Sequence, residues 1–272
     1  MRHHPGLFNL VDGKRVAVVG PAGYLMNYSA GDFIDSFDIV CTINSLSSEN
    51  PDIQESYGTR TDILVHNFCY KNKRYILSDL RKNPNVWKKV KLLVAPHANR
   101  KNFTQEDRNI SKLSESLYDE ICIHGKNDCI EPKPIYKTSL RDTTILFKSI
   151  YRRSLPAHAR KKIPTVGIAF LDMIVRYPVK HLFLTGFSFY QGGQTIDTLW
   201  KPGHCIGRAL RQNRRKLNSG RRPGHGKLVH KRQLEYFKEK FIPLNKDKLT
   251  LDSYLNELLD LEYEDIYELP PK

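Results

Sequence analysis

The 272-residue sequence predicts a single Rossmann-like α/β domain whose mostly parallel sheet is flanked by helices. Short apolar runs alternate with segments of helical spacing, which is the order expected of a parallel sheet with helical crossovers. Two of the apolar runs end directly in a glycine, at Gly20 and Gly186. No break in composition occurs before Gly192, so we expect residues 1–272 to form one domain.

The first unit of the predicted sheet begins with the apolar run at residues 14–19, which indicates a strand. The turn Gly20-Pro21-Ala22-Gly23 follows, then about ten residues of helical spacing at 24–34 and a second strand at 37–43. This is a βαβ unit, and the first turn of such a unit binds phosphate or ribose. The turn has neither the GxGxxG spacing of a dinucleotide site nor the GKS or GKT of a P-loop.

The middle of the chain continues the alternation. Strands are expected at 63–67, 90–95 and 121–124, and helices at 104–120 and 139–151. Thr165 then stands at a helix N-cap position, and apolar residues follow at helical spacing until Pro178 ends the pattern. Residues 181–185 predict a buried strand. The small residues Thr165 and Gly167 leave helix N–H groups accessible to an anion, although an ordinary helix–strand unit has the same pattern.

The last third of the chain is strongly charged. A polar stretch rich in Gly and Arg predicts a basic flexible loop or lid at residues 192–226, within the single domain. Helical spacing resumes at 231–241, and an acidic final helix is expected at 249–261. The net charge of +15 indicates an anionic partner, which includes an anionic substrate, a polysaccharide, a membrane surface or nucleic acid. A solvated loop is the alternative explanation of the basic run.

The cysteines and the apolar segments bear on the cellular compartment. Five scattered cysteines have no metal-ligand spacing and are best interpreted as reduced thiols: Cys41, Cys69, Cys122, Cys129 and Cys205. No run approaches the ~20 apolar residues of a membrane span. The N-terminal residues lack the apolar core of a secretory signal. We therefore expect a cytoplasmic protein, either free or peripheral to a membrane.

Several candidate site residues are expected at the carboxyl ends of the strands, where open α/β sheets bind ligands. The candidate donor-binding residues are Gly20, Gly23, Tyr24, Asn44, Thr165, Gly167 and Gly186. His225 and His230 follow the basic loop, and a histidine near neutral pKa can act as a general base toward a sugar hydroxyl. Surface histidines in a basic segment are the alternative. No DxD pair follows a strand, so no metal site is expected.

These residues also resemble a known family. VVGPAGYLMNYSAGDFIDSFDIVCTIN, at residues 18–44, is similar to the large "L" motif of the sialyltransferases of glycosyltransferase family 29. YGTRTDILVHN resembles the segment that follows that motif, and residues 164–187 resemble the small "S" motif. HKRQLE, at residues 230–235, resembles the family's His-x4-Glu motif. The segments occur in the family's order, and the resemblance implies a sialyltransferase-type variant of the glycosyltransferase A fold.

Two differences accompany the resemblance. The L motif usually carries Asn-Ser-Gly-Asn after its first glycine, whereas this chain has Pro21-Ala22-Gly23-Tyr24. The chain also lacks the cysteines that join the two motifs in animal enzymes. GHGKLVHKRQLEYF is additionally similar to bacterial sialyltransferases of family 42, in which the histidine of a Gly-His pair is the base. That similarity selects His225, whereas the family 29 motif selects His230.

The resemblance implies an inverting, metal-independent glycosyltransferase. The donor would be a CMP-activated acidic sugar, either sialic acid or 3-deoxy-octulosonic acid. The CMP-sugar is a co-substrate, and no cofactor is expected. The acceptor would be a glycan or glycolipid, including an anionic one or one at a membrane surface. The alternative is a non-catalytic protein on a degenerate transferase fold that binds a polyanion or nucleic acid. Nucleic acid is disfavoured because the basic run lacks interleaved aromatic residues on which bases stack.

Overall fold

The structure is a computed structural model, and it describes residues 4–44, 48–66, 83–96, 133–137, 145–146, 149–150, 164–189 and 227–272. Eight strands form one sheet in the order β5-β4-β3-β2-β1-β6-β7-β8, and every neighbouring pair is parallel. The strands are β1 (Arg15–Val19), β2 (Ile39–Ile43), β3 (Ile63–Val65), β4 (Leu92–Ala95), β5 (Ile135–Lys137), β6 (His181–Thr185), β7 (Leu249–Asp252) and β8 (Ile266–Tyr267). The parallel α/β fold that the sequence predicts is confirmed.

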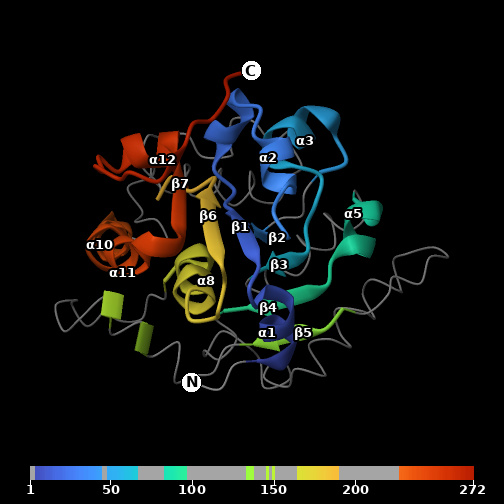
Figure 1. The fold of residues 1–272 in the computed structure, drawn as a ribbon, viewed down its shortest axis with the longest axis horizontal. Helices are drawn as coiled ribbons and strands as arrows, with labels where there is room; N and C mark the ends of the chain where they lie inside the picture. The colour runs from blue at the N-terminus through green and yellow to red at the C-terminus, as the bar shows by residue number, and fades with distance from the viewer. Residues whose placement is uncertain are drawn as a thin grey trace, which may run out of the picture.

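The order of the strands places a topological switch point between β1 and β6. From β1 the chain adds β2 to β5 on one side, and it then returns to add β6, β7 and β8 on the other. Figure 1 shows the result, with β1 in blue beside β6 in yellow although they are far apart in sequence. Ligands of open parallel sheets bind outside the carboxyl ends of the strands at such a point. The switch point therefore directs attention to the residues that follow β1 and β6.

Side chains alternate across the two faces of the sheet, as the strand period of two requires. In β1, Val16 and Val18 belong to the larger core, which includes residues of α1 (Pro5–Val11) and α8 (Val166–Ile174). Ala17 and Val19 face the smaller core, which η1 (Gly23–Asn27), α2 (Gly31–Asp35) and α3 (Pro51–Tyr57) cover. Because both faces are covered, the central strands are buried and lack an alternating polar pattern.

The prediction of one continuous helix at residues 24–34 is wrong. The structure instead has the 3₁₀-helix η1, a break, and the short helix α2. At the break, Ser29 donates its backbone N–H to Pro270, and Tyr28 forms a bridge with Pro271. The backbone there pairs with the C-terminal segment and cannot continue a helix.

The helix expected at residues 249–261 is also wrong. Residues Leu249–Asp252 form β7, an interior strand between β6 and β8, and α12 (Ser253–Leu258) begins only afterwards. The Asp252 side chain caps this helix by accepting the backbone N–H of Leu255 at 2.6 Å. Parallel pairing with β6 and a buried cap outweigh the helical spacing.

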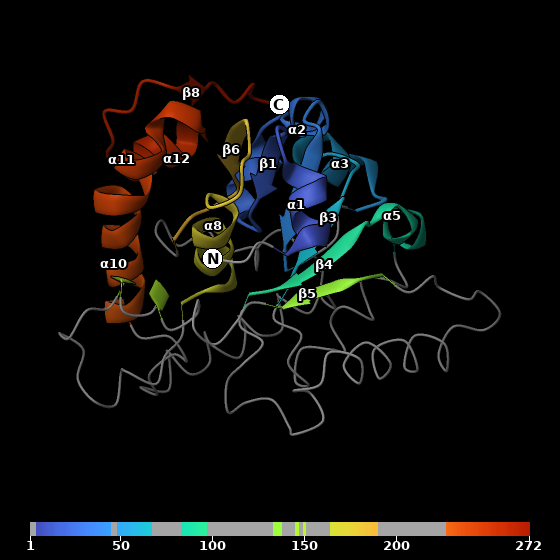
Figure 2. The same ribbon diagram turned by 60° about the horizontal axis from the view of Figure 1, so that its bottom comes forward.

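The predicted helix at 231–241 begins earlier and changes its winding. It consists of α10 (Lys227–Tyr236), the π-helical segment η5 (Phe237–Phe241) and α11 (Ile242–Asn245). Figure 2 shows α10 and α11 as one column beside α8. The remaining described helices are α5 (Pro84–Lys89) and the 3₁₀-helix η6 (Lys246–Lys248).

Several expected elements lie outside the described residues. These are the helix at 104–120, the strand at 121–124, most of the helix at 139–151 and the basic loop at 192–226. In the part of the chain that the structure does describe, no helix has the length and apolar character needed to span a bilayer.

Candidate active site

Two glycines bring the ends of β1 and β6 into direct backbone contact. Gly20 donates its N–H to the carbonyl of Thr185 at 2.8 Å, and Ala22 donates to the carbonyl of Gly186 at 2.8 Å. A Cβ on Gly20 would lie 2.3 Å from the Gly186 oxygen, and one on Gly186 would lie 2.2 Å from the Gly20 oxygen. Gly186 also has a φ of +75°, which a side chain disfavours. Both positions therefore require glycine.

Tyr24 and Asp252 form a buried polar pair beside this crossing. The Tyr24 hydroxyl donates to Asp252 Oδ2 at 2.5 Å and accepts the Gly186 N–H at 2.7 Å. The two side chains are 1% and 0% exposed. Burial raises the pKa of Tyr24 well above its usual value, with Asp252 adding to the rise, so the phenol keeps its proton. Tyr24, a predicted donor contact, thus directs its hydroxyl into the protein.

Asn44 and His66 follow the neighbouring strands β2 and β3 at the same edge of the sheet. Asn44 has a φ of 67°, and its N–H donates to the carbonyl of Val65 at 2.8 Å. Asparagine adopts this left-handed conformation more readily than most residues. His66 is 4% exposed, and desolvation lowers its pKa to about 3, so the imidazole is neutral at pH 7. Sequence analysis did not single out His66.

The start of α8 lies at this edge because the helix precedes β6 and returns antiparallel to it. Thr165 occupies the N-cap position, as predicted, but its side chain does not cap the helix. Its hydroxyl and its N–H both donate to Gln233 Oε1 of α10, at 2.9 and 3.0 Å. Gly167 is buried, and a Cβ there would lie 2.8 Å from the Phe187 ring. This glycine allows the segment after β6 to pack on α8.

The second polar contact between these helices joins Tyr236 to Asp172, with 2.6 Å between the Tyr236 hydroxyl and Asp172 Oδ1. Residues 165 and 233 meet near one end of the pair, and 172 and 236 meet further along. The two helices therefore run in the same direction, and the start of α10 lies at the site edge. Position 230 lies one helical turn before Gln233 on the same face of α10.

The two candidate bases differ in what the structure describes. His230 lies within α10, whereas His225 lies outside the described residues. Glu235, the last residue of the HKRQLE segment, forms an ion pair with Arg232 at 2.6 Å. Glu235 is thus held by its own helix.

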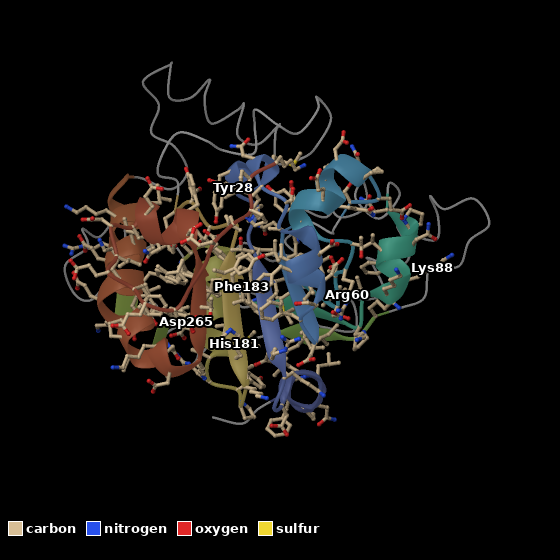
Figure 3. The ribbon with its side chains drawn as sticks, turned by 45° about the horizontal axis from the view of Figure 1, so that its top comes forward. Tyr28, Arg60, Lys88, His181, Phe183 and Asp265 are labelled. Atoms are coloured by element: carbon tan, nitrogen blue, oxygen red, sulfur yellow. The ribbon has the colours of Figure 1, made fainter. Side chains whose placement is uncertain are left out.

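Figure 3 shows the two edges of the sheet. His181 begins β6 at the amino edge, and Tyr28, which follows η1, lies near the opposite, carboxyl edge. Gly20, Gly23, Tyr24, Asn44 and Gly186 follow β1, β2 or β6 at the carboxyl edge, and Thr165 and Gly167 begin α8. The edge thus combines backbone amides, a carboxamide and a helix N-terminus, a set suited to binding a ribose and a phosphate. In the described portion, no three His, Cys, Asp or Glu side chains are grouped as a metal site would require.

Sequence reasoning missed Asp252 and Gln233, each for a different reason. Asp252 lies in a segment predicted to be helical, so its position at a strand end was not visible. Gln233 lies in the HKRQLE segment, but its contact with Thr165 joins residues 68 apart. The sequence signal for Asp252 was the LTLD pattern, in which Leu249 and Leu251 alternate with polar residues before a good N-cap.

Comparison with known proteins gives one match to a family. Residues 8–172, more than half of the chain, match the model of glycosyltransferase family 29 (sialyltransferase). The matched range contains β1 and its glycine turn, Asn44 and the beginning of α8. No match to a curated protein was found.

Solved structures resemble the whole fold. The sialyltransferase CstII from Campylobacter jejuni in complex with cytidine-5'-monophosphate has a TM-score of 0.51 and 16% identity, covering 96% of this chain and 90% of that chain. The same enzyme in complex with CMP-3FNeuAc has a TM-score of 0.52 and 16% identity, covering 95% and 96% of the two chains. At this identity the similarity shows a shared fold.

Proposed function

The chain belongs to glycosyltransferase family 29, the sialyltransferases, and on this premise we propose that it transfers an acidic sugar from a CMP-sugar to a glycan. The sugar is sialic acid or 3-deoxy-octulosonic acid, and the acceptor is a glycan or glycolipid. The observation that carries the proposal is the backbone crossing of Gly20 and Gly186 at the switch point, inside a fold shared with a sialyltransferase bound to CMP. The crossing lies beside the switch point at the carboxyl edge of the sheet, which is where open α/β sheets bind nucleotides.

The proposed donor site uses groups at the carboxyl edge of the sheet. The Asn44 carboxamide would bind the ribose or the phosphate. The first hydrogen bond along α8 runs from the Ala169 N–H to the Thr165 carbonyl, so the N–H groups of residues 166–168 have no acceptor within the helix. The Thr165 side chain leaves them available because it donates to Gln233. These N–H groups and the helix dipole favour a phosphate at that end.

The proposed reaction is a direct displacement. The acceptor hydroxyl oxygen attacks the anomeric carbon while the bond from that carbon to the CMP phosphate oxygen breaks, which inverts the anomeric centre. The departing phosphate carries the electron pair, and the N-terminus of α8 stabilises its charge. A histidine takes the proton of the acceptor hydroxyl. Position 230 supports His230 in this role, since Gln233, one turn further along α10, contacts the N-cap of α8. His225 is the second candidate.

We also propose that the reaction needs no divalent metal. The leaving group is a nucleoside monophosphate, which develops less charge than a diphosphate and can be stabilised by amide dipoles. The net charge of +15 would draw an anionic donor or acceptor to the protein. The monophosphate leaving group thus supports a metal-independent transferase, and the positive charge supports an acceptor that is anionic or lies at a membrane surface.

Calorimetric titration with CMP, followed by transfer assays with CMP-sialic acid and CMP-3-deoxy-octulosonic acid, tests the proposal. We expect saturable CMP binding at moderate salt and sugar transfer that survives EDTA. Loss of transfer in EDTA, with recovery on Mg²⁺ or Mn²⁺, would contradict the metal-independent mechanism.

The high positive charge also favours the second candidate, a non-catalytic polyanion-binding protein. A short DNA duplex is the matched probe for it. Salt-sensitive duplex binding together with no response to CMP would replace the transferase proposal with this one.

A further inference from the structure

We propose that Asp252 and Tyr24 act as a positioning pair that fixes Gly186, and through it the donor site, in the geometry required for CMP binding. The inference rests on the proposed function, because it concerns the same site. Asp252 lies outside the segment that matches the family, at the end of β7. It acts through Tyr24 and contacts neither donor nor acceptor directly.

The pair joins three strands at their carboxyl ends. Asp252 is the last residue of β7, Tyr24 lies in η1 after β1, and Gly186 directly follows β6. The contacts run from Asp252 Oδ2 to the Tyr24 hydroxyl at 2.5 Å and from that hydroxyl to the Gly186 N–H at 2.7 Å. Both side chains are buried. The phenol therefore joins the Asp252 side chain to the Gly186 backbone beyond the last paired residues of β6 and β7, which also pair directly as parallel strands.

The direction of each hydrogen bond in the pair is fixed by chemistry. The Gly186 N–H can only donate, so the Tyr24 oxygen accepts from it. The Tyr24 O–H must then donate to another acceptor, and Asp252 Oδ2 is that acceptor. Desolvation raises the pKa of Tyr24, which keeps the phenol proton in place for this role. Without the carboxylate, the phenol would lose the partner that orients it.

Gly186 is held at both of its peptide groups. Tyr24 binds its N–H, and its carbonyl accepts the N–H of Ala22 at 2.8 Å. Its φ of +75° and its close backbone contact with Gly20 exclude any residue other than glycine here. A change in the orientation of Tyr24 would therefore move the glycine crossing. The Tyr254 ring stacks on Tyr24 with 4.0 Å between centroids and keeps the phenol plane in place.

The second oxygen of Asp252 explains why a carboxylate is suited to this position. Asp252 Oδ1 accepts the N–H of Leu255 at 2.6 Å and caps α12, while Oδ2 accepts from Tyr24. Asparagine would keep an oxygen for one donor but would present an N–H₂ group to the other. Both contacts are satisfied only by two acceptor oxygens. This requirement makes Asp252→Asn a near-isosteric disruption of the pair.

The test compares CMP affinity, and the KM and kcat for a CMP-sugar, in Tyr24→Phe, Asp252→Asn and the double variant. Tyr24→Phe keeps the ring and its stacking on Tyr254 but removes the link. We expect each single variant to raise the Kd of CMP and the KM of the donor about tenfold, with a smaller change in kcat. The double variant should bind CMP no more weakly than either single variant, because both substitutions break the same chain of contacts.

Tyr263→Phe is the matched control. The Tyr263 hydroxyl donates to the carbonyl of Leu249 at 2.5 Å, at the opposite end of β7. Its loss should lower the melting temperature while leaving the Kd of CMP unchanged. Should Asp252→Asn fail to fold, Tyr24→Phe alone decides the question.

The outcomes separate this inference from the proposed function. Wild-type protein that binds no CMP would overturn the proposed function and the positioning role with it. Wild-type protein that binds CMP, with Tyr24→Phe and Asp252→Asn binding equally well, would overturn the positioning role alone. Equal loss of affinity in Tyr263→Phe would also overturn it, because the effect would then follow from general destabilisation of β7.

Discussion

The carboxyl ends of the strands and the helix pair beside them hold their groups by different means. At the strand ends, Gly20 and Gly186 are joined by backbone hydrogen bonds and by contacts too close for any side chain. The α8–α10 pair is joined by side chains, through Thr165 with Gln233 and Asp172 with Tyr236. Main-chain contacts allow little adjustment, whereas side chains can change rotamer. We infer that the strand ends determine where the donor lies and that the helix pair carries the group that moves a proton.

The largest expected effect tests this division at the helix pair. Removing a general base lowers the rate by about 10²- to 10⁴-fold. His230→Ala should therefore abolish transfer while CMP still binds, and His225→Ala should reduce the rate less. Single-turnover transfer across pH, with calorimetric titration of CMP, measures both quantities. If His225→Ala is inactive and His230→Ala keeps the wild-type rate, the base is His225.

His181→Asn is the control for the histidine variants. His181 begins β6 at the opposite edge of the sheet, where its Nε2 lies 3.1 Å from the Thr250 hydroxyl oxygen. Its replacement should leave the rate of transfer and the affinity for CMP near wild type.

The second-largest effect is expected from a substitution that disrupts the glycine crossing at the strand ends. Gly186→Ala combines a disfavoured φ with a backbone clash, and we expect it to lower the free energy of unfolding by about 2–5 kcal/mol and to abolish CMP binding. Gly13→Ala is the matched control, because Gly13 has a φ of +66° but a Cβ there would meet nothing within 4 Å beyond its chain neighbours. It should cost only about 1 kcal/mol, the strain of the backbone. Urea unfolding measures both, and equal losses would show that the crossing is not tightly packed.

The third effect concerns pH and again belongs to the strand ends. Burial lowers the pKa of His66 from 6.5 to about 3, so the unfolded chain binds a proton below pH 6.5 that the folded chain does not. The free energy of unfolding is therefore highest above pH 6.5 and decreases as the pH falls toward 3. At pH 5 the loss amounts to about 2 kcal/mol, since each pH unit contributes about 1.4 kcal/mol.

His66→Gln should remove that part of the pH dependence. Urea unfolding at pH 7 and pH 5 would show a smaller fall in unfolding free energy for the variant than for the wild type. An identical fall in both proteins would mean that another group causes the acid sensitivity.

The two regions also differ in how far the sequence predicts them. The strands β1 and β6 were predicted because their residues are continuously apolar and each run ends in a glycine. These features are local, so the sequence displays them directly. Gly20 was placed in the first turn of a βαβ unit and Gly186 at the end of a strand, whereas the switch point between them follows only from the strand order of the structure.

Contacts between distant segments were not predictable in the same way. The Thr165 hydroxyl was expected to cap α8, but a glutamine 68 residues away accepts it. β7 was predicted to be the start of an acidic helix at residues 249–261, whereas its pairing with β6 decides the structure. Sequence periodicity records the local preference and not the tertiary contact that overrides it.

The smallest expected effect separates the ligand contact of Asn44 from its backbone conformation. Loss of one hydrogen bond to a donor should weaken CMP binding by about 1 kcal/mol, which is about fivefold in Kd. Asn44→Ala would also strain the backbone, because Asn44 has a φ of 67°. Asn44→Gly removes the same carboxamide but adopts this φ freely, so it isolates the ligand contact. Both variants should bind CMP about fivefold more weakly in calorimetric titration, and only Asn44→Ala should lose about 1 kcal/mol of unfolding free energy through strain. Unchanged CMP affinity in Asn44→Gly would remove the Asn44 side chain from the donor site and leave the backbone crossing as the main determinant of donor binding.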